Sequence, residues 1–204
     1  MKKLLMAASA VALCGVGSAQ AQEENFFGTD VSPYVGVYGG YGWSDAEEDT
    51  LDVDADLKGG DYGLYAGVSI DGILDQTVNR VGLGLSGRLE GHYGWSGQDD
   101  ELGGADIEKE NEWGISFKPG LSVIDEIIPV AAAPYAILGY RRTEYEVDGL
   151  GDEDYSGFEL GVGAELLAYD RATVRLEYTH VFYNEKDDID IDEDNIRLGL
   201  GYSF

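Results

Sequence analysis

Residues 195–204 read Asn-Ile-Arg-Leu-Gly-Leu-Gly-Tyr-Ser-Phe. Large apolar side chains alternate there with small or polar ones, and the sequence ends on the aromatic ring of Phe204. A repeat of two residues places the two kinds of side chain on opposite faces of a β-strand. We therefore expect a final strand with one apolar face. Because no tail follows to cover its edge, we expect its neighbour to be another strand.

The same alternation recurs in seven further segments, which are residues 34–43, 62–70, 81–95, 113–123, 132–145, 158–166 and 174–182. Segment 132–145 is the least regular and lies beside Pro129 and Pro134. Each run has about the 9–11 residues that cross a bilayer as a tilted strand. An even number of strands closes an up-and-down barrel without a free edge. The predicted fold class is an all-β, eight-stranded antiparallel up-and-down transmembrane β-barrel.

Aromatic residues lie near the ends of the apolar faces, as in the girdles of membrane barrels. They are Tyr41, Trp43, Tyr93, Trp95, Trp113, Tyr202 and Phe204. The alternative fold is a soluble β-sandwich or lipocalin-like barrel, which would pack the apolar face inside and turn the charged face outward.

The N-terminus has the features of a secretory signal peptide. Lys2 and Lys3 precede an apolar run over residues 4–16, and Ala19-Gln20-Ala21 fits the cleavage site. We predict a cleaved signal at 1–21 and a single barrel domain at 22–204. The only cysteine, Cys14, lies inside the signal, so the mature chain would have no disulfide. No later segment has the ~20 apolar residues of a membrane helix.

The chain is strongly acidic, with 13 basic and 40 acidic residues and a formal net charge of −27. This balance argues against a nucleic-acid partner, because phosphate binding depends on Lys and Arg. The predicted connections at 45–60, 97–111, 144–155 and 185–194 carry 26 of the acids and only three bases. All four connections leave the same end of an up-and-down barrel. With a periplasmic N-terminus, these acidic loops would be extracellular.

Nine charged residues fall on the predicted inward faces, and we interpret them as a polar network in the lumen. They are Arg88, Glu90, Lys118, Arg141, Glu159, Glu165, Arg175, Glu177 and Arg197. Opposite charges in a narrow interior are expected to pair in layers that fix the barrel register. The alternative is a gated ion path lined by the same groups.

No catalytic, metal or cofactor site is predicted. The residues two positions after His92 and His180 are Gly94 and Phe182, so neither histidine has the serine partner found in lipid A deacylases. Counting from Asp52, the sixth and twelfth positions are Leu57 and Gly63, which do not fit a calcium-binding EF-hand loop. Weak binding of divalent cations by the acidic loops and a merely solvated acidic surface remain as alternatives.

Several segments together resemble the small outer-membrane barrels of Gram-negative bacteria, the OmpA-like and opacity-type porin family. The segments are the signal peptide, residues 33–40, residues 176–178 and residues 198–204. The resemblance implies a location in the outer membrane, in contact with its lipid, and insertion by the barrel-assembly machinery. That machinery would read Tyr202 and Phe204 as its assembly signal. Because the sequence stops at Phe204, a periplasmic peptidoglycan-binding domain is not expected.

From these observations we expect a monomeric, non-enzymatic barrel with a structural or surface-interaction role. The acidic loops would meet an extracellular ligand or divalent cations. A narrow cation-preferring porin and an outer-membrane lipid-modifying enzyme are the alternative functions.

Overall fold

The computed structural model describes residues 30–48, 53–71, 83–102, 105–123, 132–147, 151–169, 171–184 and 189–204. These residues form eight strands, which are β1 (Asp30–Glu48), β2 (Val53–Asp71), β3 (Leu83–Leu102), β4 (Ala105–Val123), β5 (Ala132–Val147), β6 (Gly151–Tyr169), β7 (Ala172–Tyr183) and β8 (Ile189–Ser203). The predicted signal peptide, residues 1–21, lies outside the described residues. In the described part of the chain, no helix is long and apolar enough to cross a membrane.

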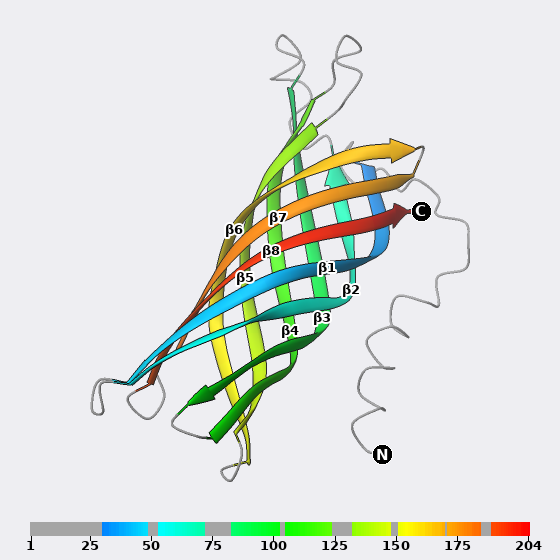
Figure 1. The fold of residues 1–204 in the computed structure, drawn as a ribbon. Helices are drawn as coiled ribbons and strands as arrows, with labels where there is room; N and C mark the ends of the chain where they lie inside the picture. Colours follow the sequence, from blue (N-terminus) through cyan, green and yellow to red (C-terminus); the bar gives the residue numbers. More distant parts are fainter. Residues whose placement is uncertain are drawn as a thin grey trace.

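Each strand pairs antiparallel with the next, and β8 pairs with β1, so the sheet closes into one barrel (Figure 1). The predicted fold class is therefore confirmed. The least regular predicted strand, 132–145, corresponds to β5, and Pro134 is accommodated within it with an exposed side chain.

The register of the ladders shows that the strands are tilted relative to the barrel axis. Starting from Tyr34 on β1, the residues paired in turn around the ring are Gly67, Glu90, Ser116, Gly139, Glu159, Val181, Glu193 and, again on β1, Ser44. The ring thus closes ten residues beyond its starting point. A stagger of this kind accompanies a tilt of about 35–45°, and eight strands leave an interior just wide enough for side chains to fill.

The strands continue well beyond the predicted membrane-spanning segments at one end of the barrel. β1 pairs with β2 as far as Glu48 and Val53, and β3 pairs with β4 as far as Leu102 and Ala105. The predicted boundaries of the acidic loops at 45–60, 97–111, 144–155 and 185–194 are therefore wrong, because most of these residues are in strands. Solvated strands tolerate acidic side chains on their outward face, so the charge of these segments did not mark the strand ends.

The outward face is apolar along the middle of all strands. Exposed hydrophobic side chains, one from each strand, include Val37, Leu64, Leu89, Ile115, Leu138, Val162, Leu176 and Leu198. Aromatic rings border this band. Trp95 stacks on Tyr62 with centroids 5.8 Å apart on the side of the hairpins, and Tyr202 contacts Phe204 at 5.4 Å on the opposite side. This arrangement fits a membrane barrel and not the soluble alternative.

Candidate functional site: an occluded lumen

Ionised side chains fill the barrel interior and form two networks. The lower network, nearer the end where β1 begins, consists of Arg88, Glu90, Lys118, Glu165, Arg175 and Glu177. The upper network lies nearer the hairpins that join β1–β2, β3–β4, β5–β6 and β7–β8, which point downward in Figure 1. It consists of Asp61, Lys109, Glu112, Arg141, Glu159, Glu193 and Arg197.

Glu90 is the centre of the lower network. Its carboxylate accepts hydrogen bonds from Lys118 Nζ at 2.7 Å and from Arg175 Nη1 at 2.5 Å. Lys118 Nζ also donates to Glu177 Oε1 at 2.6 Å. Glu90 comes from β3, Lys118 from β4, and Arg175 and Glu177 from β7. The lower network therefore links opposite walls of the barrel across its interior.

Tyrosines complete the coordination of the lower carboxylates. The hydroxyl of Tyr34 donates to Glu90 Oε2 at 3.0 Å, and that of Tyr135 donates to Glu177 Oε1 at 2.6 Å. The Arg175 guanidinium lies 3.4 Å from the centroid of the Tyr65 ring. Each buried charge thus has an oppositely charged, hydroxyl or aromatic neighbour, as burial in a medium of low dielectric constant requires.

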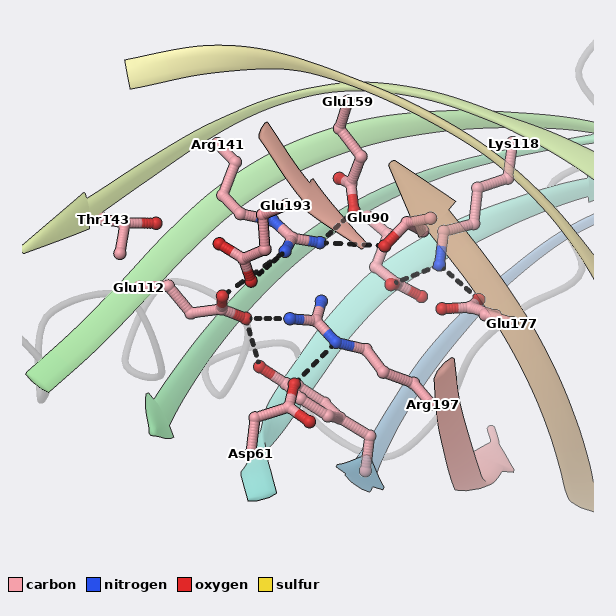
Figure 2. A network of polar contacts seen from close by, with 12 residues as sticks. Asp61, Glu90, Glu112, Lys118, Arg141, Thr143, Glu159, Glu177, Glu193 and Arg197 are labelled. Atoms are coloured by element: carbon pink, nitrogen blue, oxygen red, sulfur yellow. Dashed lines mark hydrogen bonds and ion pairs between the residues drawn. The ribbon is translucent and has the colours of Figure 1, made fainter. Parts of the chain in front are cut away.

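Glu112 is the centre of the upper network (Figure 2). Its carboxylate accepts hydrogen bonds from Arg197, from Lys109 Nζ at 3.0 Å and from Arg141 Nη1 at 3.4 Å. Lys109 Nζ also donates to Glu193 Oε1 at 2.5 Å. Lys109, Glu112 and Arg141 have no solvent-exposed surface. These groups therefore block the lumen at their level.

Two further carboxylates bind the arginines of the upper network. Asp61 Oδ2 accepts a hydrogen bond from Arg197 Nε at 2.8 Å, and Glu159 accepts one from Arg141 (Figure 2). Residues from five strands, β2, β4, β5, β6 and β8, therefore meet in this network.

Tyrosines and apolar side chains enclose the upper network. Tyr38 donates to Glu112 Oε1 at 3.0 Å, and Tyr183 donates to Glu193 Oε2 at 2.7 Å. A small apolar cluster packs beside Glu193 in the part of the barrel formed by the extended strands, and its buried members are Val181, Tyr183 and Ile191. The described side chains in this part of the interior thus pack against one another.

A cavity of about 10 Å³ lies between the two networks. Its lining includes Glu90 and Lys118 from below, Glu159 and Arg197 from above, and His92. This volume is about that needed to hold one water molecule. The cavity separates the networks without forming a passage between the two ends of the barrel.

The inward-facing glycines do not outline a channel either, because larger side chains occupy the space beside them. The Tyr65 ring lies where a Cβ atom at Gly36 would stand, and Tyr38 Cζ lies 2.6 Å from the corresponding position at Gly63. Other glycines are covered in the same way: Gly120 by Tyr135, Gly139 by Glu159, Gly161 by Thr179 and Gly199 by Arg175. The glycines therefore make room for tyrosine rings and long polar side chains. Gly82 lies outside the described residues.

The structure places all nine charged residues selected from the sequence in the two networks. Six of them make up the whole lower network, including the Arg88–Glu165 pair at 2.6 Å. The other three, Arg141, Glu159 and Arg197, belong to the upper network. Sequence reasoning missed four members of the upper network, namely Asp61, Lys109, Glu112 and Glu193. Continuing the alternation of each strand to the next inward position would have found Asp61, Glu112 and Glu193. Lys109 faces inward because the register shifts between Lys109 and Asn111.

The two histidines have different environments, and neither pairs with a serine. His92 lies inside, its ring centroid 6.4 Å from that of Tyr38, and its Nε2 has no hydrogen-bond partner among the described residues. His180 lies on the outer side of β7, and its Nδ1 is 2.9 Å from Asp194 Oδ1. In the part of the chain that the structure describes, no three His, Cys, Asp or Glu side chains converge as a metal site.

Residues 8–204 match the family model described as outer membrane protein beta-barrel domain. The chain belongs to this family. The predicted resemblance to small Gram-negative outer-membrane barrels is therefore confirmed, and so is the outer membrane as the location of the protein.

Curated relatives and a solved structure agree with this assignment. The chain is 29% identical over 176 residues to the 25 kDa outer-membrane immunogenic protein of Brucella ovis. The match covers 84% of this chain and 76% of that protein. The corresponding Brucella abortus protein is 28% identical over 184 residues, with 84% and 78% covered. Neisserial surface protein A has 16% sequence identity and a TM-score of 0.55, with 85% of this chain and 99% of that chain covered. At this identity the structural likeness shows the fold alone.

Proposed function

We propose that the protein is a closed, non-conducting outer-membrane barrel with a structural or surface-interaction role. The observation that carries the proposal is the occlusion of the lumen. Lys109, Glu112 and Arg141 are completely buried in mutual ion pairs, and Glu193 and Arg197 reach Lys109 and Glu112 across the interior from β8. An open pore of eight strands would need a hydrated path, and side chains occupy the described interior at the level of both networks.

The working surface in this proposal is the set of four acidic hairpins, defined as residues 45–60, 97–111, 144–155 and 185–194. They emerge from one end of the barrel (Figure 1). Apart from Glu193 and Lys109, which lie in the lumen, they carry 25 acidic and two basic residues, and this excess favours a cationic partner, either an extracellular ligand or divalent cations. Continuous strand pairing into the hairpins supports a fixed presentation of these charges.

The orientation follows from the same topology. In an up-and-down barrel whose N-terminus is periplasmic, the first, third, fifth and seventh connections lie on the extracellular side. The acidic hairpins, which are these connections, would therefore be extracellular. At the periplasmic end, Tyr202 and Phe204 are about half exposed, at 48% and 51%. Their position supports the role of assembly signal for the barrel-assembly machinery.

We also propose that the protein is not an enzyme. His180 contacts the carboxylates of Asp194 and Asp192, and His92 is enclosed in the lumen. Neither imidazole is placed against a serine hydroxyl that it could activate for attack on a lipid ester.

Thiol labelling of intact cells tests the orientation with a matched pair of sites. Asn184 and Arg171 are both exposed and flank β7 at opposite ends. In a Cys14→Ser background, a membrane-impermeant maleimide should label Asn184→Cys on intact cells and label Arg171→Cys only after cell lysis. The reverse pattern would contradict the proposed orientation.

Solute flux into proteoliposomes tests the closed state. Vesicles that contain the protein should swell no faster in isotonic solutions of small amino acids or sugars than empty vesicles do. Swelling that is selective for small solutes would replace the proposal with the narrow-porin alternative.

A further inference from the structure

The upper and lower networks differ in charge balance. Among the described residues, the lower network contains three carboxylates and three bases. The upper network contains four carboxylates, Asp61, Glu112, Glu159 and Glu193, but only the three bases Lys109, Arg141 and Arg197. An uncompensated charge in a fully buried network is strongly unfavourable. One additional positive charge would balance the upper network.

Four buried polar atoms close to Gly40 and Gly42 on β1 have no hydrogen-bond partner from the described residues, and neither does Arg141 Nε of the upper network. The four atoms are Asp61 Oδ1, Asn195 Oδ1, Asn195 Nδ2 and Gln98 Nε2. Asp61 is 3% exposed, and Asn195 and Gln98 are not exposed at all. Buried polar atoms in folded proteins are almost always bound by protein groups, ordered water or ions. The unpartnered atoms therefore indicate a bound polar species.

The unpartnered atoms lie along one stretch of β1. Asp61 Oδ1 lies 2.5 Å from the position that a Cβ atom at Gly40 would take. Asn195 Oδ1 lies 2.6 Å from the corresponding position at Gly42, which Gln98 Nε2 also contacts. Gly40 and Gly42 face the same way and are about 7 Å apart along the strand. Carboxylate and amide groups from β2, β3 and β8 therefore converge over these two glycines.

We propose that the upper lumen binds one monovalent metal cation, Na⁺ or K⁺, between Asp61 and Asn195. Carboxylate and amide oxygens are the ligands that hard cations prefer. Together with the three bases, a single added positive charge balances the four carboxylates, whereas a divalent ion would leave an excess of positive charge. Rotation of the Gln98 amide would present its oxygen to the ion and its NH₂ group to Ser44, whose hydroxyl is 3.4 Å from Gln98 Oε1. The proposal does not depend on the proposed surface role.

Thermal unfolding in detergent micelles tests the site through the size of the cation. The purified protein is compared in NaCl, KCl and tetramethylammonium chloride at equal ionic strength, so that general screening is constant. A cation present at about ten times its dissociation constant should raise the midpoint by about 3–5 °C relative to tetramethylammonium. Asp61→Asn should abolish this difference. Asp154→Asn, which removes a carboxylate outside the barrel that pairs with Arg142, should preserve it.

Crystals of the unmodified protein grown in RbCl provide a test that does not depend on the folding of any variant. Anomalous scattering from Rb⁺ should give a peak in the upper lumen beside Asp61 and Asn195. A peak without anomalous signal would identify water and overturn the proposal. Equal stability in all three salts would also overturn it, and would assign the balancing charge to a proton, for example on His92.

Discussion

The lower and upper networks fill the same lumen in different ways. The lower network is electrically balanced around Glu90 and is built from residues within the membrane-spanning part of β3, β4, β6 and β7. The upper network is centred on Glu112 and takes Lys109 and Glu193 from residues close to the hairpins. Lys109 and Glu193 lie where strand pairing continues beyond the apolar band, and the register shift beside Lys109 turns its side chain inward. The acidic hairpins therefore supply two of the residues, Lys109 and Glu193, that close the lumen.

The largest effect is expected from Glu112→Gln. This change leaves Lys109, Arg141 and Arg197 without their shared carboxylate, and it should lower the free energy of unfolding by about 3–5 kcal/mol. Urea unfolding in lipid vesicles measures the loss. The control is Glu108→Gln at an exposed position on the same strand, which should leave stability unchanged. Equal effects of the two variants would show that the upper network is not the main support of the upper barrel.

Glu90→Gln should have the next largest effect. Glu90 pairs with two bases, Lys118 and Arg175, whereas Glu112 pairs with three, so we expect a loss of about 3 kcal/mol, the lower end of the range for buried pairs. The same unfolding measurement also tests whether the networks are independent. The losses for Glu90→Gln and Glu112→Gln should add within about 0.5 kcal/mol in the double variant. A larger deviation would mean that the cavity does not separate the two networks.

A smaller effect is expected from Gly63→Ala. The new methyl group would stand against the backbone oxygen of Tyr93 and 2.6 Å from Cζ of Tyr38, whose hydroxyl binds Glu112, and overpacking of this kind costs about 1–3 kcal/mol. Gly60→Ala is the matched control, because Gly60 is exposed and its nearest neighbouring atom is 3.8 Å from the added Cβ. If Gly63→Ala were as stable as the control, neither the Tyr38 ring nor the Tyr93 backbone could be held tightly over the glycine.

The smallest effect is expected from Arg142→Ala. Arg142 Nη2 lies 2.7 Å from Asp154 Oδ2, but both side chains are about half exposed on the outside of the barrel. Water screens such pairs, so the unfolding midpoint should not change measurably. A clear loss of stability would show that ion pairs outside the barrel matter as much as those in the lumen.

The regular alternation was sufficient to predict the fold and the lower network. Inward positions such as Arg88, Lys118 and Glu177 lie inside segments where large apolar residues alternate with small or polar ones at most positions. The upper network was harder to predict because its members lie where acidic residues obscure the apolar face. Asp61 and Glu193 continue the alternation of their strands by one step. The inward position of Lys109 depends on a β-bulge, which reverses the faces and leaves no mark in the pattern.

The central claim is that the two networks close the barrel, and single-channel recording in a planar bilayer tests it most directly. The purified protein should give no stable openings in KCl at ordinary holding potentials, with or without added Ca²⁺. Glu112→Gln, recorded under the same conditions, shows whether weakening the upper network increases brief openings. Stable, cation-selective openings of the unmodified protein would contradict the account, because they require a continuous hydrated path through the interior that the networks occupy.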